Sequence, residues 1–129
     1  MTWRLVTDDR CKALVERALD GITLGPYACI GMEREGEVTA AFLFNGFTGY
    51  DAHATAAVSR LTRGFMVEVG RFAFDFLKLG RLTFTTDSPR VVSLNEKMGA
   101  RIEGCLRDHF GPGRDGIIMG CLASEWRYR

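Results

Sequence analysis

The stretch RLTFTTDSPRVVSLNEKMGARIEGCLR, residues 81–107, contains the signals that decide the fold. The run LTFTT, residues 82–86, predicts a strand. Ser88 and Pro89 then predict the start of a helix, because serine caps free N–H groups and proline suits the first helical position. Gly99 predicts the end of this short helix, and residues 102–106 predict another strand.

The segments on either side predict one long helix and one more strand. From residue 62 to 79, apolar side chains recur at helical spacing and form a wide apolar stripe on one face, and Gly80 ends the helix. Residues 117–122 predict the last strand. The polar loop between the last two strands, residues 108–116, makes them a long hairpin.

The first half of the chain predicts a strand, a helix and then three antiparallel strands. Residues 3–6 predict the first strand, and the polar residues that follow supply N-cap chemistry for a helix. The runs 27–32 and 38–44 flank a polar turn and predict a hairpin, and residues 53–59 predict a third strand. The complete order, β-α-β-β-β-α-β-α-β-β, predicts an α/β sandwich with a mixed sheet.

Composition excludes several classes of function. The chain has 129 residues, 47% hydrophobic and 26% charged, which predicts one domain spanning residues 1–129. A net charge of +1 argues against nucleic acid and anionic membranes as partners. No stretch approaches the about 20 apolar residues of a membrane helix, and the N-terminus lacks the apolar run of a signal peptide. We therefore expect a cytoplasmic protein.

The cysteines and histidines are too scattered to predict a metal site or a disulfide framework. His53 and His109 are far apart in the sequence and have no cysteine pair nearby, so we expect no metal. The cysteines have no CxxC spacing, and a reducing cytosol would keep them as buried thiols at Cys11, Cys29, Cys105 and Cys121.

Residues 81–107 resemble the C-terminal half of the GCN5-related N-acetyltransferases (GNAT), especially the branch that acetylates the N-termini of ribosomal proteins. In that branch an Asn-containing turn follows a strand, and a helix ends in a Glu-Lys-Leu-Gly-Phe-like stretch before Glu-Gly-x-Leu-Arg. The helix predicted over residues 62–79 resembles the family's acetyl-CoA-binding helix, and residues 115–126 resemble its last strand. The matching positions in the quoted stretch are Asp87, Ser88, Arg90, Leu94, Glu96, Lys97, Met98, Gly99, Ala100, Glu103, Gly104, Leu106 and Arg107.

The resemblance implies a fold and a site for acetyl-CoA. Family members have a mixed, mostly antiparallel sheet of about six to seven strands with splayed central strands and helices on both faces. The pantetheine of acetyl-CoA pairs with the open strand edge, and the diphosphate docks at the N-terminus of the long helix. On this sequence, Ala57 and Val58 would pair with pantetheine. The residues that would surround the diphosphate are Arg60, Leu61, Thr62, Arg63 and Gly64.

Three features depart from the family's pattern. The phosphate loop usually has two small residues, but SRLTRG, residues 59–64, has one glycine, so the backbone would approach the diphosphate less closely unless Arg60 and Arg63 compensate. Ser88 stands where the family has the turn asparagine, and the resemblance implies that it takes part in cofactor binding. Asn95 replaces a tyrosine often used as general acid; an amide cannot donate a proton as tyrosine does, although it can hydrogen-bond the CoA sulfur.

His53 is the first candidate for the base, or the water-relay partner, that takes a proton from the attacking amine. It lies on the predicted strand that lines the site, and imidazole titrates near neutral pH. The alternative is a histidine that supports a loop through hydrogen bonds. Asp51, two residues earlier on the same strand face, could orient His53 or merely solvate the turn. Glu33 and Glu35 compete as bases, but we expect both in an exposed polar turn.

These residues predict an acetyl-CoA-dependent N-acetyltransferase in which a primary amine, on a small molecule or a peptide, attacks the thioester directly. Two alternatives stay open: a catalytically inactive GNAT-like binding module, and a GNAT-fold enzyme that uses another acyl-CoA. The chain is close to the minimum length for this fold, which suggests a phage or prophage type and a homodimer whose partner completes the pocket. The sequence does not identify the acceptor.

Overall fold

The structure, a computed structural model, describes residues 2–19, 25–58 and 62–129 and contains a seven-stranded sheet in the order β1-β2-β3-β4-β5-β7-β6. The strands are β1 (Arg4–Val6), β2 (Tyr27–Arg34), β3 (Glu37–Asn45), β4 (Asp51–Val58), β5 (Arg81–Thr86), β6 (Arg101–Leu106) and β7 (Gly116–Leu122). The helices are α1 (Asp9–Leu19), α2 (Arg63–Gly70) and α3 (Pro89–Met98), with a π-helix η1 (Arg71–Phe76) and a 3-10 turn η2 (Ala123–Glu125).

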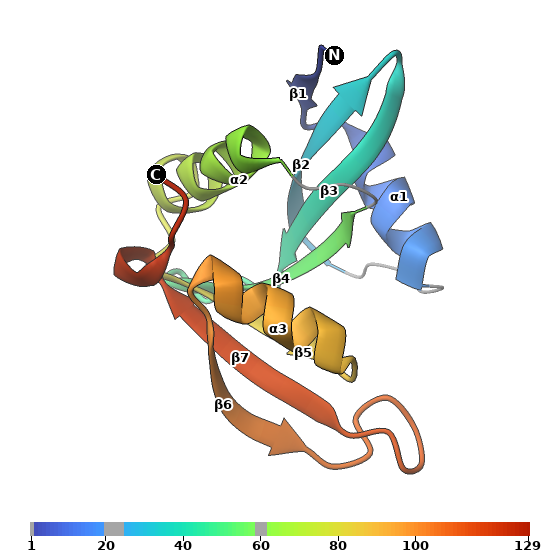
Figure 1. The fold of residues 1–129 in the computed structure, drawn as a ribbon, viewed down its shortest axis with the longest axis vertical. Coiled ribbons are helices and arrows are strands. Elements are labelled where there is room, and N and C mark those ends of the chain that lie inside the picture. The colour runs from blue at the N-terminus through green and yellow to red at the C-terminus, as the bar shows by residue number, and fades with distance from the viewer. Residues whose placement is uncertain (1, 20–24, 59–61) are drawn as a thin grey trace.

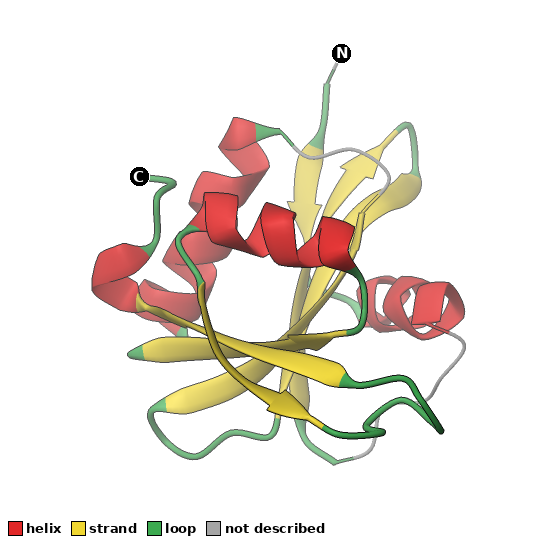
Figure 2. Cartoon of the chain, turned by 60° about the horizontal axis from the view of Figure 1, so that its bottom comes forward, coloured by secondary structure: helices red, strands yellow, loops and turns green. Residues whose placement is uncertain are grey.

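The sheet separates two apolar layers, and helices cover both of its faces. Helix α1 packs on β2 to β4 through a small cluster that includes Cys11, Val15 and Leu43. A larger cluster on the opposite face joins α2, η1 and α3 to the sheet, and in it the ring of Phe42 packs against that of Phe65. Figure 2 shows α3 crossing one face, while α1 lies beyond the other. The predicted mixed, mostly antiparallel sheet with helices on both faces is confirmed.

The two central strands, β4 and β5, run parallel but stay paired over only three residues, from Asp51↔Arg81 to His53↔Thr83. Beyond this point β4 follows β3 as far as Val58, whereas β5 follows β7 as far as Thr86. The sheet therefore divides into two halves, which leave the junction in different directions in Figure 1. The predicted splay of the central strands is present.

The helix expected over residues 62–79 is shorter and has two parts. Thr62 caps α2 by accepting a hydrogen bond from the backbone N–H of Phe65 (3.2 Å). The chain then passes into η1, where the N–H of Leu77 reaches back five residues to the carbonyl of Phe72 (2.8 Å). Lys78 has a φ of 60°, which turns the chain out of the helix before the predicted end.

The signals in residues 81–107 produce the predicted elements. The Ser88 Oγ accepts a hydrogen bond from the backbone N–H of Val91 (3.3 Å), so it is the N-cap of α3. Gly99 ends α3 with a φ of 116°, in the region that favours glycine. The strands on either side, β5 and β6, do not pair with each other because β7 lies between them.

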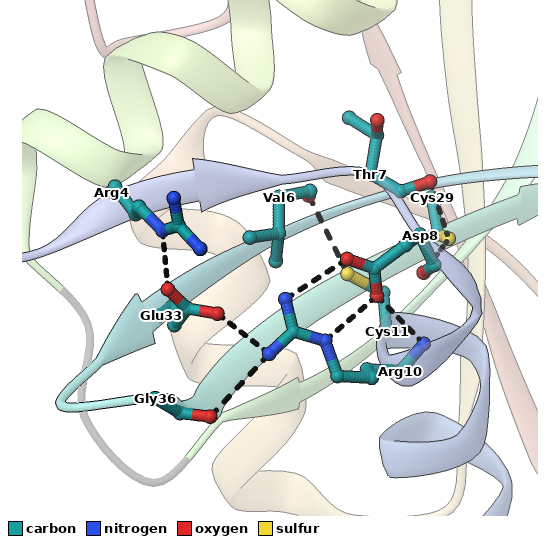
Figure 3. Close-up of polar contacts among 9 residues, drawn as sticks. All are labelled: Arg4, Val6, Thr7, Asp8, Arg10, Cys11, Cys29, Glu33 and Gly36. Atoms are coloured by element: carbon teal, nitrogen blue, oxygen red, sulfur yellow. Dashed lines mark hydrogen bonds and ion pairs between the residues drawn. The ribbon is translucent and has the colours of Figure 1, made fainter.

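The expectation of an exposed Glu33 is wrong. Strand β2 continues to Arg34, and β1 pairs with it so that Arg4 lies opposite Glu33, which covers the carboxylate. Glu33 is buried and forms ion pairs with Arg4 and with Arg10 (2.6 Å to its Nη1), as Figure 3 shows. The hydrogen bonds from Arg4 and then Arg10 hold the pKa of Glu33 below its usual range. Glu33 therefore joins β1, α1 and β2 and does not face the site described below.

Three of the four cysteines, Cys11, Cys29 and Cys121, are buried free thiols as expected, but Cys105 is exposed on the edge strand β6. Within residues 2–19, 25–58 and 62–129, no helix is both long and apolar enough to cross a membrane.

Candidate functional site

A cavity of about 350 Å³ opens where β4 and β5 separate. Residues 53–56 of β4 line one side, and residues 84–87 of β5 and the following turn line the other. Helix α3 contributes Val91 and Asn95, and the loop between β6 and β7 contributes His109, Phe110 and Arg114. The separation of two strands therefore creates a cavity in the middle of the sheet.

The cavity reaches both faces of the sheet. Successive side chains of a strand point to opposite faces, and the cavity touches His53 and Thr55 as well as Ala54 and Ala56. Ala54 belongs to the apolar layer under α2 and α3, so His53 and Thr55 belong to the other face. The α3 face of the cavity is mainly apolar, while the opposite face carries imidazole and hydroxyl groups.

His53 lies between two threonine hydroxyls on the polar face. Its Nε2 is 3.2 Å from the Oγ1 of Thr85, and its Nδ1 is 3.4 Å from the Oγ1 of Thr55. Burial is the main cause that lowers the pKa of His53 below its ordinary value; the charge of Asp51 opposes this shift and His109 adds to it. At neutral pH His53 is therefore an uncharged imidazole that can accept a proton.

Asp51 is on the same strand face as His53, but its hydrogen bond goes elsewhere. Its Oδ2 accepts a hydrogen bond from the Oγ1 of Thr83 (2.7 Å), and its Oδ1 lies 3.5 Å from the Nε of Arg81. Arg81 also donates to Glu103 from its Nη2 (2.7 Å). Asp51 acts on His53 through its charge, and the threonines set the orientation of the imidazole.

Asn95 lies on the apolar side of the cavity, on the inner face of α3. Its side chain is buried, and its Nδ2 lies 3.7 Å from the Sδ of Met119, a weak hydrogen bond. It therefore has hydrogen-bonding capacity left for a group that enters the cavity. Ser88 does not line the cavity, because its hydroxyl caps α3.

The structure describes only some of the residues that were expected around a diphosphate. Arg60 and Leu61 lie outside the described residues. Thr62 caps α2, and Gly64 is exposed beside the ring of Trp3. Arg63 extends toward the C-terminus, where its Nη2 lies 3.5 Å from the carbonyl oxygen of Arg129, with its guanidinium over the ring of Tyr128.

Ala57 and Val58 are the last residues of β4, beyond the part of this strand that lines the cavity. Ala57 pairs with Ala41 of β3 and Val58 with Ala40, while the ladder to β5 has already ended at His53. Alternate N–H and C=O groups of β4 therefore point into the gap between the two halves of the sheet. This edge is suited to pairing with an extended, amide-bearing ligand.

Thr85, which contacts His53 from β5, was not among the predicted site residues. A signal was present in the run LTFTT: with alternation, Thr83 and Thr85 face one side of the sheet while Leu82 and Phe84 enter the core. Which strand lies beside His53 depends on the parallel pairing of β4 and β5, and that pairing is not encoded locally.

No protein-family model matches the sequence, and no curated protein matches it either. Solved structures do match. A mutant of the spermidine N-acetyltransferase SpeG from Vibrio cholerae has a TM-score of 0.75 at 14% identity, with 98% of each chain covered. The IAA acetyltransferase from Bacillus cereus has a TM-score of 0.71 at 16% identity, with 94% of this chain and 99% of that chain covered.

This chain shares their fold. A third structure, the manganese-bound spermidine/spermine N-acetyltransferase SpeG from Vibrio cholerae, agrees, with a TM-score of 0.73 at 14% identity over 95% of this chain and 93% of that chain. At such low identity the likeness establishes the architecture, and the chemistry must be argued from the residues of this chain.

Proposed function

We propose that this protein is a GNAT-family N-acetyltransferase that transfers the acetyl group of acetyl-CoA to a primary amine. The observation that carries the proposal is the cavity between β4 and β5, which reaches both faces of the sheet. A donor and an acceptor can enter such a cavity from opposite faces and meet in the middle. The fold shared with several N-acetyltransferases supports the same reaction class.

The residues present fit a donor on the α3 face. The unpaired edge of β4 offers alternating N–H and C=O groups to the amides of pantetheine, and Asn95 offers a hydrogen bond near the point where a thioester would lie. When bound, acetyl-CoA supplies an acetyl carbon that is open to attack by an amine. A backbone N–H on the open edge of β4 can stabilise the negative charge that develops on the acetyl oxygen.

The residues on the opposite face suit proton removal from the acceptor. An amine enters as an ammonium ion and must lose a proton before its nitrogen can attack. We propose that neutral His53 takes this proton at its unprotonated ring nitrogen, directly or through one water molecule, once the amine or the water replaces the threonine hydroxyl at that nitrogen; the other threonine holds the ring. The new C–N bond then forms as the C–S bond breaks; the nitrogen gives up its second proton to become an amide, and the CoA thiolate that leaves takes up one proton, so that the products are the amide, the CoA thiol and one released proton. Direct attack requires no acyl-enzyme nucleophile.

Three finer expectations belong to the same proposal. The matched positions in residues 81–107 support the ribosomal-protein branch of the family. A homodimer is supported by the edge strand β6, where Ile102 is 54% exposed and Leu106 is 37% exposed. A cytoplasmic location is supported by the free thiol of Cys105, which a reducing compartment would preserve.

Filling the cavity tests the proposal. We expect the Ala56→Phe protein to bind acetyl-CoA more weakly than the unchanged protein by about tenfold or more, because Ala56 lines the cavity and a benzyl group would occupy its volume. Titration calorimetry measures this. Ala13→Phe is the matched control, because Ala13 is exposed on α1, and we expect its affinity to be unchanged.

The same titration separates the alternatives. Equal acetyl-CoA affinity of the Ala56→Phe and unchanged proteins would contradict the proposed site. Absence of binding to the unchanged protein would favour an inactive GNAT-like module. A donor series of acetyl-, propionyl- and succinyl-CoA identifies an enzyme that uses another acyl group, which would bind its own donor more tightly than acetyl-CoA.

A further inference from the structure

The loop between β6 and β7, residues 107–115, is held in shape by its own hydrogen bonds. The carboxylate of Asp108 accepts a hydrogen bond from the backbone N–H of Gly113 (2.9 Å). The backbone N–H of Phe110 donates to the carbonyl oxygen of Arg114 (3.0 Å). Because the loop is braced internally, a contact with another element can fix the position of all its side chains together.

An ion pair ties the β6–β7 loop to the turn between β5 and α3. The Nη2 of Arg114 lies 2.6 Å and its Nε 3.1 Å from the Oδ2 of Asp87, and both residues line the cavity. Their side chains are 61% and 36% exposed, so water screens the pair and it holds the loop only moderately. Its loss should therefore displace the loop without unfolding the sheet.

The loop places His109 on the polar face of the cavity. A Cβ added at Gly116 would lie 3.0 Å from the Cβ of His109 and 3.0 Å from the Cγ2 of Thr85, so these two side chains lie together above this glycine. The Oγ1 of Thr85 is in turn 3.2 Å from the Nε2 of His53. His109 and Phe110 line the same cavity as His53. The position of the loop therefore decides which side chains surround the proposed base.

We propose that Arg114 is a positioning residue: through its ion pair with Asp87 it holds the β6–β7 loop over the polar face and keeps His109 beside His53. This inference rests on the proposed function, in which His53 takes the proton from the amine. Burial is the main cause that lowers the pKa of His53; the charge of Asp51 opposes this shift and that of His109 adds to it. A displaced loop would admit water and carry His109 away, while Asp51 stays on β4. His53 would then hold its proton more tightly, and less of the protein would carry a free base.

The test follows the imidazole signals of His53 by NMR as the pH changes, in protein without acetyl-CoA or amine. In Arg114→Gln we expect His53 to bind its proton at least about twofold more tightly, which moves the titration midpoint up by about 0.3 toward its ordinary value. Asp87→Asn should also raise the midpoint, because it breaks the same ion pair. The double variant should raise it no further than either single change, since both remove one contact.

The controls separate the position of the loop from other causes. Arg114 is a cation and Asp87 an anion, so direct charge effects on His53 would move the midpoint in opposite directions in the two single variants. Arg101→Gln breaks an ion pair with Glu125 (2.9 Å) in which neither residue lines the cavity, and the midpoint should not change. Exchanging the charges, in a protein with Asp87→Arg and Arg114→Asp, should restore most of the original midpoint.

Calorimetry with acetyl-CoA distinguishes this inference from the proposed function. If acetyl-CoA does not bind the unchanged protein, the proposed function fails and the inference fails with it. If acetyl-CoA binds, but the midpoints of Arg114→Gln and Asp87→Asn stay unchanged or move in opposite directions, only the inference is overturned. Binding of acetyl-CoA together with a raised midpoint in both single variants supports it.

Discussion

Replacing His53 with glutamine should lower kcat for acetyl transfer by about 100-fold or more, the usual contribution of a well-placed general base. Glutamine keeps a polar side chain between Thr55 and Thr85 but cannot take up a proton at neutral pH. Steady-state kinetics with a saturating acceptor measures the effect. Acetyl-CoA affinity should change little, because His53 lies on the face opposite the proposed donor site.

The pH dependence gives the His53→Gln experiment a second readout. His53 must be neutral to act as a base, and burial lowers its pKa in the free protein, so kcat/KM should rise with pH through a step whose midpoint lies below about pH 6.5. The glutamine variant should lose this acidic limb. If it keeps both the limb and the rate, His53 supports the structure and another group removes the proton.

The same pKa shift links His53 to stability. Below about pH 6.5, the folded state holds fewer protons on His53 than the unfolded state. The contribution of His53 to the free energy of unfolding should therefore be complete above about pH 6.5 and should be lost as the pH falls through the lowered folded-state pKa. The decrease attributable to His53 should be absent from His53→Gln.

Replacing Gly99 with alanine should destabilise the fold by about 3 kcal/mol or more. Gly99 has a φ of 116°, and an added Cβ would lie 2.0 Å from the backbone carbonyl oxygen of Glu125, which cannot move as a flexible side chain can. Helix α3 and the turn η2 would have to separate. Thermal unfolding measures this, with an expected fall in Tm of about 10 °C or more.

Gly36→Ala separates the two causes of this effect. Gly36 also has a positive φ, of 84°, but an added Cβ would meet nothing within 4 Å. We therefore expect a loss of about 1 kcal/mol there, from backbone strain alone. Similar losses at Gly36 and Gly99 would show that the contact with Glu125 yields easily.

Local sequence signals predicted most of the elements because they act over a few residues. Ser88, Pro89 and Gly99 fix the ends of α3, and two strand-forming runs on either side of a polar turn fix the strands of the first hairpin. The predicted end of the long helix was wrong because tertiary packing shapes η1. In η1, Ala73 is fully buried and Phe72 packs against Phe44. The prediction that Glu33 is exposed was wrong because Arg4 of β1 pairs with its carboxylate, and Arg4 is more than 25 residues away in the sequence.

The residues of the candidate site could be predicted where their position depends on a single strand or helix. His53 and Asn95 both line the cavity, as the resemblance implied, because each depends mainly on its own element. The partners of Asp51 could not be predicted, since Thr83 and Arg81 reach it only through the pairing of β4 with β5. Thr85 reaches His53 for the same reason.

We propose that acetyl-CoA binds along the open edge of β4. Backbone amide NMR of isotope-labelled protein, titrated with acetyl-CoA, tests it most directly. We expect the largest shifts, and new protection from hydrogen exchange, at amides of residues 54–58 that point into the gap, together with a shift of the side-chain amide of Asn95. Saturable shifts confined to other surfaces, such as α1 or the edge strand β6, would contradict it.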